Sequence, residues 1–186
     1  DDCAQGLIGV GDDFDGDGAG FEVSCFGLFD GWALSSPSGG YPGVQGYLYN
    51  WVNSNGQNIS SEALAANLPA LLSYTVTVTD MNACSNDSTT AVFTQPLLFD
   101  ANVTTTNYGG ATHAPFSVNF VDNTISIDPF YFNWTWEDGF DFYSSGTTSM
   151  NHQFTTDNIG FNEVYVVLTN ATTGCMDTVF FDINVQ

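Results

Sequence analysis

This sequence of 186 residues contains no lysine and no arginine. Its 21 acidic residues are accompanied by only two histidines, which gives a formal net charge of −21 at pH 7. Nucleic acids and anionic membrane surfaces are bound through cationic side chains, so this composition excludes both as partners. Side-chain salt bridges cannot hold the fold, and the charge repels itself, so bound calcium, high salt or assembly contacts are expected to matter.

Long apolar runs and the motifs of common enzymes are also missing. No stretch approaches the roughly 20 apolar residues of a membrane-spanning helix, which predicts no membrane insertion. There is no zinc-protease, nucleophile-elbow, P-loop or dinucleotide fingerprint, and no lysine for Schiff-base or phosphate chemistry. His113 and His152 lie in loop-like and strand-like stretches where a structural role is the simpler interpretation. The sequence therefore predicts a protein that is not an enzyme.

Cysteine is scarce, and its spacing is not that of a metal site. Cys3, Cys25, Cys84 and Cys175 form no CxxC pair and have no histidine nearby, which argues against zinc. In an oxidising compartment such cysteines form disulfides. The chain also starts at Asp1 instead of methionine, so we expect that a leader was removed and that the protein is secreted, with an extracellular or cell-surface location.

The chain does have enough apolar material for a core, with 43% hydrophobic and 15% aromatic residues. In its clearest element, Tyr74, Val76 and Val78 alternate with three threonines, the period-2 pattern of a half-buried strand. A similar strand follows at 164–170, and a cysteine comes soon after each of the two. The chain therefore predicts two β-modules in tandem.

Further short apolar stretches, separated by turn residues, predict strands throughout. They are expected over 21–24, 32–35, 47–52, 73–79 and 89–94 in the first module, and over 116–121, 131–137, 150–154, 163–170 and 178–185 in the second. The patch at 61–67 looks helical but is too short for more than a single turn. Pro96 and the polar stretch 102–110 mark the boundary between the modules.

The first module carries a series of short motifs in a fixed order. These are Val23–Gly27, Gly31–Ala33, Ser38–Pro42, Tyr49–Trp51, Asn55–Gln57, Leu68–Ala70, Tyr74–Asp80, Ala83–Ser85 and Thr94–Pro96. Over residues 21–96 they resemble the repeat of SprB-type gliding adhesins, giant cell-surface filaments of Bacteroidota. The resemblance implies a β-sandwich in which Cys25 pairs with Cys84. Cys3 and Cys175 could then bond within one chain or between neighbours.

Residues 97–186 resemble a PKD (polycystic kidney disease) domain. The motifs that carry this resemblance are Val118–Thr124, Trp134–Gly139, His152–Phe154, Tyr165–Asn170 and Gly174–Thr178. Such domains are seven-stranded sandwiches, so the expected fold class is all-β, with two tandem Ig-like or PKD-like β-sandwich domains. From the alternation alone, Phe132, Trp134 and Trp136 share one face and are expected to anchor the core.

The remaining N-terminal segment, residues 1–20, holds an acidic Gly/Asp loop. Its aspartates are spaced like the first ligands of an EF-hand calcium loop, although the closing glutamate is out of register. The candidate calcium ligands are Asp13, Asp15, Asp17 and Glu22. Calcium is therefore a candidate cofactor, and a solvated acidic turn is the alternative.

Two further kinds of site are suggested by short patterns. Leu7, Ile8 and Val10 form an apolar run that could add as an edge strand to a neighbouring molecule or pair within its own chain. Ser88 and Thr178 match the pattern of Bacteroidota O-glycosylation, an aspartate followed by Ser or Thr and then a small apolar residue or threonine.

Together these features predict a structural subunit of an extracellular or cell-surface filament or adhesin. It would assemble with itself as a homopolymer through β-sandwich domains braced by disulfides and calcium. The alternative is a carbohydrate-binding or spacer module of a larger secreted enzyme or adhesin. That module would be a monomer with surface glycans as its partner.

Overall fold

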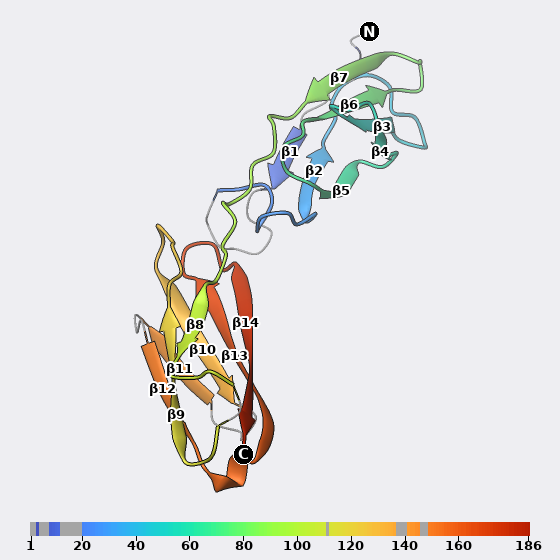
Figure 1. Ribbon diagram of the computed structural model, residues 1–186. Helices are drawn as coiled ribbons and strands as arrows, with labels where there is room; N and C mark the ends of the chain where they lie inside the picture. The colour runs from blue at the N-terminus through green and yellow to red at the C-terminus, as the bar shows by residue number, and fades with distance from the viewer. Residues whose placement is uncertain (1–2, 4–7, 12–19, 111, 137–140, 146–148) are drawn as a thin grey trace. The chain divides into compact units, whose positions relative to one another are not determined.

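The structure is a computed structural model that describes residues 3, 8–11, 20–110, 112–136, 141–145 and 149–186 (Figure 1). The chain divides into two compact units, Asp1–Leu97 and Leu98–Gln186. Regular structure in the described ranges is β throughout, apart from a single 3-10 turn at Thr156–Asn158. The all-β class predicted from the sequence is confirmed. No helix in the described part of the chain is long and apolar enough to cross a membrane.

The first unit is a sandwich of two antiparallel sheets. One sheet has the strand order β1-β2-β5, and the other has the order β4-β3-β6-β7. The strands are β1 (Ile8–Gly11), β2 (Gly31–Ser35), β3 (Leu48–Asn53), β4 (Asn58–Ser60), β5 (Leu64–Leu68), β6 (Tyr74–Thr79) and β7 (Ser85–Thr89). Trp51 of β3, Ala33 of β2 and Val76 of β6 are completely buried between the sheets.

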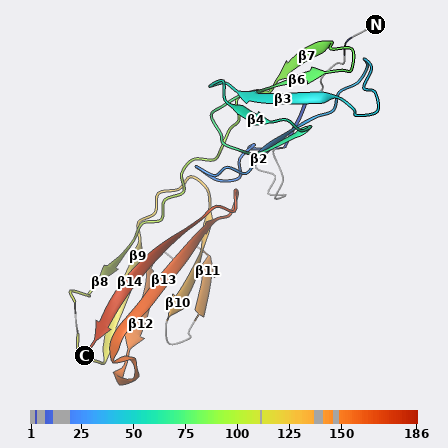
Figure 2. The same cartoon turned by 90° about the vertical axis from the view of Figure 1, so that its right-hand side faces the viewer.

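The second unit repeats this arrangement strand for strand (Figures 1 and 2). Its sheets have the orders β12-β9-β8 and β11-β10-β13-β14. The strands are β8 (Val103–Thr106), β9 (Phe116–Asp122), β10 (Phe130–Trp136), β11 (Asp141–Ser145), β12 (Ser149–Phe154), β13 (Gly160–Asn170) and β14 (Met176–Val185). In both units the first, second and fifth strands form one sheet, and the fourth, third, sixth and seventh form the other. This is the two-sheet arrangement of Ig-like sandwiches.

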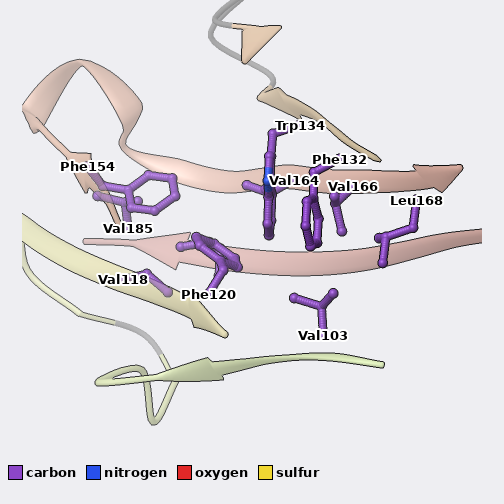
Figure 3. Close-up of a cluster of buried hydrophobic side chains, with 11 residues drawn as sticks. Val103, Val118, Phe120, Phe132, Trp134, Phe154, Val164, Val166, Leu168 and Val185 are labelled. Atoms are coloured by element: carbon purple, nitrogen blue, oxygen red, sulfur yellow. The ribbon is translucent and has the colours of Figure 1, made fainter. Parts of the chain in front are cut away.

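Alternating apolar residues build the core of the second unit. Phe132 and Trp134 of β10, both 2% exposed, meet Phe120 of β9 from the opposite sheet, and the Phe120 and Trp134 ring centroids are 5.4 Å apart (Figure 3). On β13, Val164 and Val166 face the same interior. The prediction that Phe132 and Trp134 anchor this core is confirmed, while the side chain of Trp136 lies outside the described part.

A buried tyrosine anchors the connection between β5 and β6, which belong to different sheets of the first unit. Tyr74 begins β6, is completely buried, and donates its hydroxyl hydrogen to the carbonyl of Pro69 at 2.7 Å. This tyrosine corner is a hallmark of Ig-like sandwiches. Because burial disfavours the charged form of the ring hydroxyl, it raises the pKa of Tyr74 to about 12.

Several sequence-based predictions of elements were wrong. Residues 21–24 form no strand, although Val23 is buried, and the strand expected at 89–94 lies instead at Ser85–Thr89. The helical-looking patch at 61–67 overlaps β5, which pairs with β2. Asn67 forms a bulge there, with φ at 57°, because Gly31 pairs with Leu68 while Trp32 pairs with Ala66. Strand pairing has overridden a weak local helix preference.

The segment at residues 1–20 is not separate from the first sandwich. Its residues Ile8–Gly11 form β1, which pairs antiparallel with β2 in the register Ile8 to Ser35 and Gly11 to Trp32. The boundary predicted after residue 20 is therefore wrong, since β1 is the first strand of the unit.

Candidate functional site

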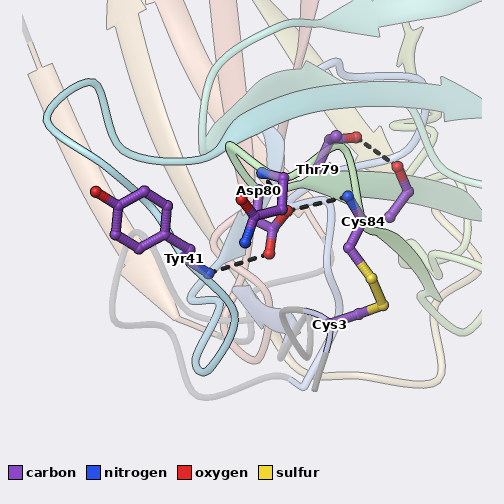
Figure 4. Close-up of a disulfide and its surroundings, with 7 residues drawn as sticks. Cys3, Tyr41, Thr79, Asp80 and Cys84 are labelled. Carbon is purple, nitrogen blue, oxygen red and sulfur yellow. Dashed lines mark hydrogen bonds between the residues drawn. A yellow bond between two sulfur atoms is a disulfide. The ribbon is translucent and has the colours of Figure 1, made fainter. Parts of the chain in front are cut away.

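In the first unit, the turn between β6 and β7 meets the loop at 36–47 and Cys3 (Figure 4). We call Cys3, Tyr41 and the turn 80–84 the braced loop end. Asp80 directly follows β6 and is only 4% exposed. Its N–H donates to the carbonyl of Cys84 at 3.0 Å, and the N–H of Ala83 donates back to the Asp80 carbonyl at 3.0 Å.

The Asp80 carboxylate organises this end by accepting three backbone hydrogen bonds. One oxygen accepts from the N–H of Tyr41 at 3.0 Å, and the other accepts from Asn82 at 2.9 Å and Cys84 at 3.0 Å. These bonds, above all those from Tyr41 and Cys84, hold the pKa of Asp80 below its ordinary 3.8, although burial opposes the shift. Because the chain has no lysine or arginine, backbone N–H groups stabilise the negative charge of this carboxylate in place of a cationic side chain.

A disulfide ties the same turn to the N-terminal segment. Cys84 is bonded to Cys3, with the two Cα atoms 5.3 Å apart and 81 positions apart in sequence. The expected pairing of Cys84 with Cys25, and the candidate pairing of Cys3 with Cys175, are therefore both wrong. All four cysteines lie in the described ranges and none is a free thiol, so Cys25 and Cys175 are disulfide-bonded as well.

The braced loop end fixes its backbone while presenting apolar side chains to solvent. The N–H of Met81 donates to the carbonyl of Tyr41 at 2.9 Å, which joins the turn to the loop. Gly43, at φ 64°, lies so close to Met81 that an added Cβ would stand 2.6 Å from its Cγ. Tyr41 is nevertheless 59% exposed, and Val44 is fully exposed. Because its backbone is already fixed, this region would lose little conformational freedom on binding, which suits contact with a partner.

The second unit has an equivalent turn after β13, built on an amide instead of a carboxylate. Asn170 is 5% exposed, and its Oδ1 accepts from the N–H groups of Thr172 at 2.8 Å and Thr173 at 3.0 Å. Its Nδ2 donates to the carboxylate of Asp128 at 3.3 Å, and its N–H donates to the carbonyl of Cys175 at 2.8 Å. The same polar position thus closes the last hairpin in both units.

The candidate calcium ligands cannot be brought together from the described residues. Asp13, Asp15 and Asp17 lie outside them. Glu22 accepts hydrogen bonds at 2.7 Å from both the N–H and the hydroxyl of Thr94, so it fastens the 20–30 loop to the segment after β7. Within the described ranges, no three His, Cys, Asp or Glu side chains gather in the way a metal ion requires.

The remaining predicted sites lie on strands. Ile8 and Val10 belong to β1 and pair with Ser35 and Ala33 of β2, while Leu7 lies outside the described residues. Of the two glycosylation candidates, Ser88 lies on β7 and Thr178 on β14, both half-buried.

Sequence reasoning missed Asp80 as the organiser of the loop end. The shared signal was visible, because an Asp or Asn follows each regular strand and a cysteine comes shortly after it. A short polar side chain at such a position commonly accepts hydrogen bonds from the amides of its own turn.

The chain matches no known family profile and no curated protein sequence. Among solved structures it is similar to the fibronectin(III)-like modules of Clostridium thermocellum CbhA, at 13% identity and a TM-score of 0.39, over 97% of this chain and 94% of that one. The chain is also similar to the three N-terminal domains of the bacteriophage RB49 capsid protein Hoc, at 15% identity and a TM-score of 0.37, over 97% of this chain and 59% of that one. A third similar structure, the four N-terminal Ig domains of Dscam1 isoform 6.44, has 10% identity and a TM-score of 0.36, over 100% of this chain and 52% of that one. At these values the fold assignment rests on the strand order of each unit.

Proposed function

We propose that this protein is a non-enzymatic structural subunit of an extracellular or cell-surface filament or adhesin. The observation that carries the proposal is that the described strands form the same seven-stranded sandwich twice in a single chain. Tandem rigid modules transmit force and span distance, which is what a filament or adhesin stalk requires. The resemblance to SprB-type repeats and PKD domains supports the same interpretation.

The chemistry of the chain is suited to an environment outside the cell. Disulfides persist in oxidising compartments, where a fold with no lysine or arginine for salt bridges can rely on them. The charge of −21 keeps separate molecules apart, so self-association would need an apolar contact, salt or a divalent cation such as calcium.

The strand addition proposed here takes place at β1, one of the edge strands of the first unit. This strand is short, stands at the edge of its sheet and pairs only with β2 among the described strands. An incoming copy of Ile8–Gly11 could therefore replace β1 in a neighbour with the same register. In a chain of such contacts that does not close on itself, the product is an open fibre.

Negative-stain electron microscopy of the native protein, with and without EGTA, tests the proposal. We expect regular fibres that loosen on chelation. Fibres that are unchanged by EGTA would support the polymer but show that calcium does not hold it together. Dispersed single molecules at all protein and salt concentrations would overturn the filament proposal.

The exposed Tyr41 favours a second candidate function, a carbohydrate-binding or spacer module, because tyrosine rings at a fixed rim can stack on sugars. A glycan array would test it with the variant Tyr41→Ser. Its control is Val44→Ser, which removes a fully exposed apolar side chain from the same loop. Binding lost in the first variant and kept in the second would support this function.

A further inference from the structure

The disulfide of the braced loop end joins the segment before β1 to a turn of the opposite sheet. Cys3 precedes Ile8, where β1 begins, and Cys84 lies in the turn between β6 and β7. Both cysteines are only half-buried, so a small thiol in solution has access to the bond. Whichever molecule supplies β1 therefore also supplies the cysteine that bonds to Cys84.

The sheet that contains β1 is suited to contact with another copy of the chain. Of the four described sheets, β1-β2-β5 is the one whose strands carry no acidic residue. Each of the other three sheets has at least one, for example Asp87, Asp122 or Asp141. In a chain with a net charge of −21, a strand from a second copy meets no carboxylate on the strands with which it would pair.

Within that sheet, β1 is the strand that could be exchanged between copies. It lies at an edge and pairs with β2 over four residues. Residues 12–30 connect it to β2, whereas β5, at the other edge, is held by the short connections 61–63 and 69–73. A connection of this length gives β1 the reach to pair with β2 of a neighbour while the other six strands of the unit keep their places.

We propose that β1 of one subunit pairs with β2 of the next in the polymer, and that the Cys3–Cys84 bond then joins the two subunits covalently. Such a bond requires the proposed assembly through β1, which it would make permanent. If the incoming strand keeps the register of Ile8 to Ser35, its Cys3 arrives where the receiver's own Cys3 lies, with a Cα–Cα distance of 5.3 Å to Cys84. A register shifted by one residue would turn over the faces of the strand and displace the cysteine.

The exchange of partners at Cys84 needs no net oxidation. A low-molecular-weight thiolate attacks the Cys84 sulfur, breaks its bond to Cys3 of the same chain and forms a mixed disulfide. The Cys3 thiolate of the incoming subunit then attacks the Cys84 sulfur and releases the small thiolate unchanged. One sulfur–sulfur bond breaks for each one that forms, and the Cys3 thiolate released from the receiver reacts at the next contact along the fibre.

The receiving cysteine is held in place without the help of Cys3. The N–H of Cys84 donates to the Asp80 carboxylate at 3.0 Å, and the carbonyl of Cys84 accepts from the Asp80 N–H at 3.0 Å. Because neither hydrogen bond involves Cys3, the turn keeps its geometry when the disulfide opens. The Cys84 sulfur is therefore positioned in advance for a Cys3 from either molecule.

The test refolds unlabelled and ¹⁵N-labelled full-length protein together from the reduced state, in a buffer of glutathione and glutathione disulfide. Remaining thiols are then blocked, and one sample is examined by electron microscopy. A second sample is digested without reduction by a protease that cuts after acidic residues, since trypsin has no lysine or arginine to cut at. Mass spectrometry then measures whether the Cys3 peptide and the Cys84 peptide of each bonded pair carry the same label.

In fibres, we expect about half of the Cys3–Cys84 pairs to combine one labelled and one unlabelled peptide, because the two kinds of subunit follow one another at random. Fibres in which every pair carries a single label would overturn this bond and leave the filament proposal standing. Mixed pairs from closed dimers that form no fibre would support the exchange and overturn the filament. Dispersed molecules with single-label pairs would overturn both.

A proline variant tests whether mixed pairs depend on β1. In Gly9→Pro/Val10→Pro, two successive N–H groups are removed, and because these point to opposite sides of a strand, one of them is a hydrogen bond to β2. We expect the fraction of mixed pairs to fall by about fivefold or more, since proline is not tolerated in a paired position. The matched control, Ala91→Pro/Val92→Pro, makes the same change at exposed positions after β7 and should keep the mixed pairs.

Equal fractions of mixed pairs in the two proline variants would mean random exchange of disulfides and would overturn the proposal. Thermal melts establish that each variant is folded. If the β1 variant fails to fold, the labels in the native protein still decide.

Discussion

At the scale of single residues, Asp80 and Asn170 answer the same structural need with different chemistry. Each closes the hairpin between the sixth and seventh strands of its unit and accepts N–H groups that the turn would otherwise leave without a partner. The carboxylate of Asp80 also reaches Tyr41, so it joins two loops. The side-chain amide of Asn170 instead donates a hydrogen bond to the carboxylate of Asp128, which an ionised Asp side chain in its place could not do.

The charge of Asp80 makes the first unit sensitive to acid. Its pKa in the folded state lies below the ordinary 3.8, so its contribution is present above that value and is lost as the pH falls through the lower folded value. We expect Asp80→Asn to lower the Tm at pH 7, with a difference from the native protein that shrinks below about pH 4. Differential scanning calorimetry across this range measures it. The exposed Asp87→Asn variant is the control, and an unchanged Tm for Asp80→Asn at pH 7 would contradict the expectation.

At the scale of elements, the disulfide fastens the segment before β1 to the turn between β6 and β7. The loop that it closes contains most of the first unit, because Cys3 and Cys84 are 81 positions apart. Closing a long loop removes much conformational freedom from the unfolded chain. The short edge strand β1 is thus held near its sheet by a covalent bond as well as by its pairing with β2.

We expect the double variant Cys3→Ser/Cys84→Ser to destabilise the first unit by about 2–4 kcal/mol, the usual effect of removing a native disulfide. Hydrogen exchange with mass spectrometry measures this unit by unit. Peptides from β3 and β6 should exchange faster, while peptides from β10 and β13 serve as the internal control because the second unit has its own core. Equal protection of β3 and β6 in both proteins would contradict the stabilising role of this bond.

At the scale of the whole molecule, the acidic side chains repel one another, and no lysine or arginine offsets this repulsion. The 21 acidic residues have no lysine or arginine to pair with, so the folded chain concentrates charge that the unfolded chain spreads out. Apolar burial, backbone hydrogen bonds and disulfides must together outweigh this repulsion in both units.

We therefore expect the Tm at pH 7 to rise by several degrees between about 10 mM and about 1 M sodium chloride, because the Debye length shortens from roughly 30 Å to 3 Å. Calorimetry over a salt series measures the rise. Near pH 4, where many carboxylates are protonated, the same series should give a smaller effect. A Tm independent of salt at pH 7 would show that repulsion is not a major term.

The sequence by itself determined the fold class, because alternation is a local property. Tyr74, Val76 and Val78 alternate with threonines, and this pattern places one face of β6 in the core whatever the strand pairs with. The same reasoning identified Phe132 and Trp134. Composition alone also determined that no lysine or arginine supports the fold, since that requires no coordinates.

Only the tertiary structure decided which distant parts meet. The partner of Cys84 could not be deduced from spacing, because four cysteines allow three pairings and proximity depends on how the strands assemble. The strand character of Leu64–Leu68 came from pairing with β2, against its local preference. The rung of Glu163 and Asp182 likewise exists only because the register of β13 and β14 brings residues 19 positions apart into opposition.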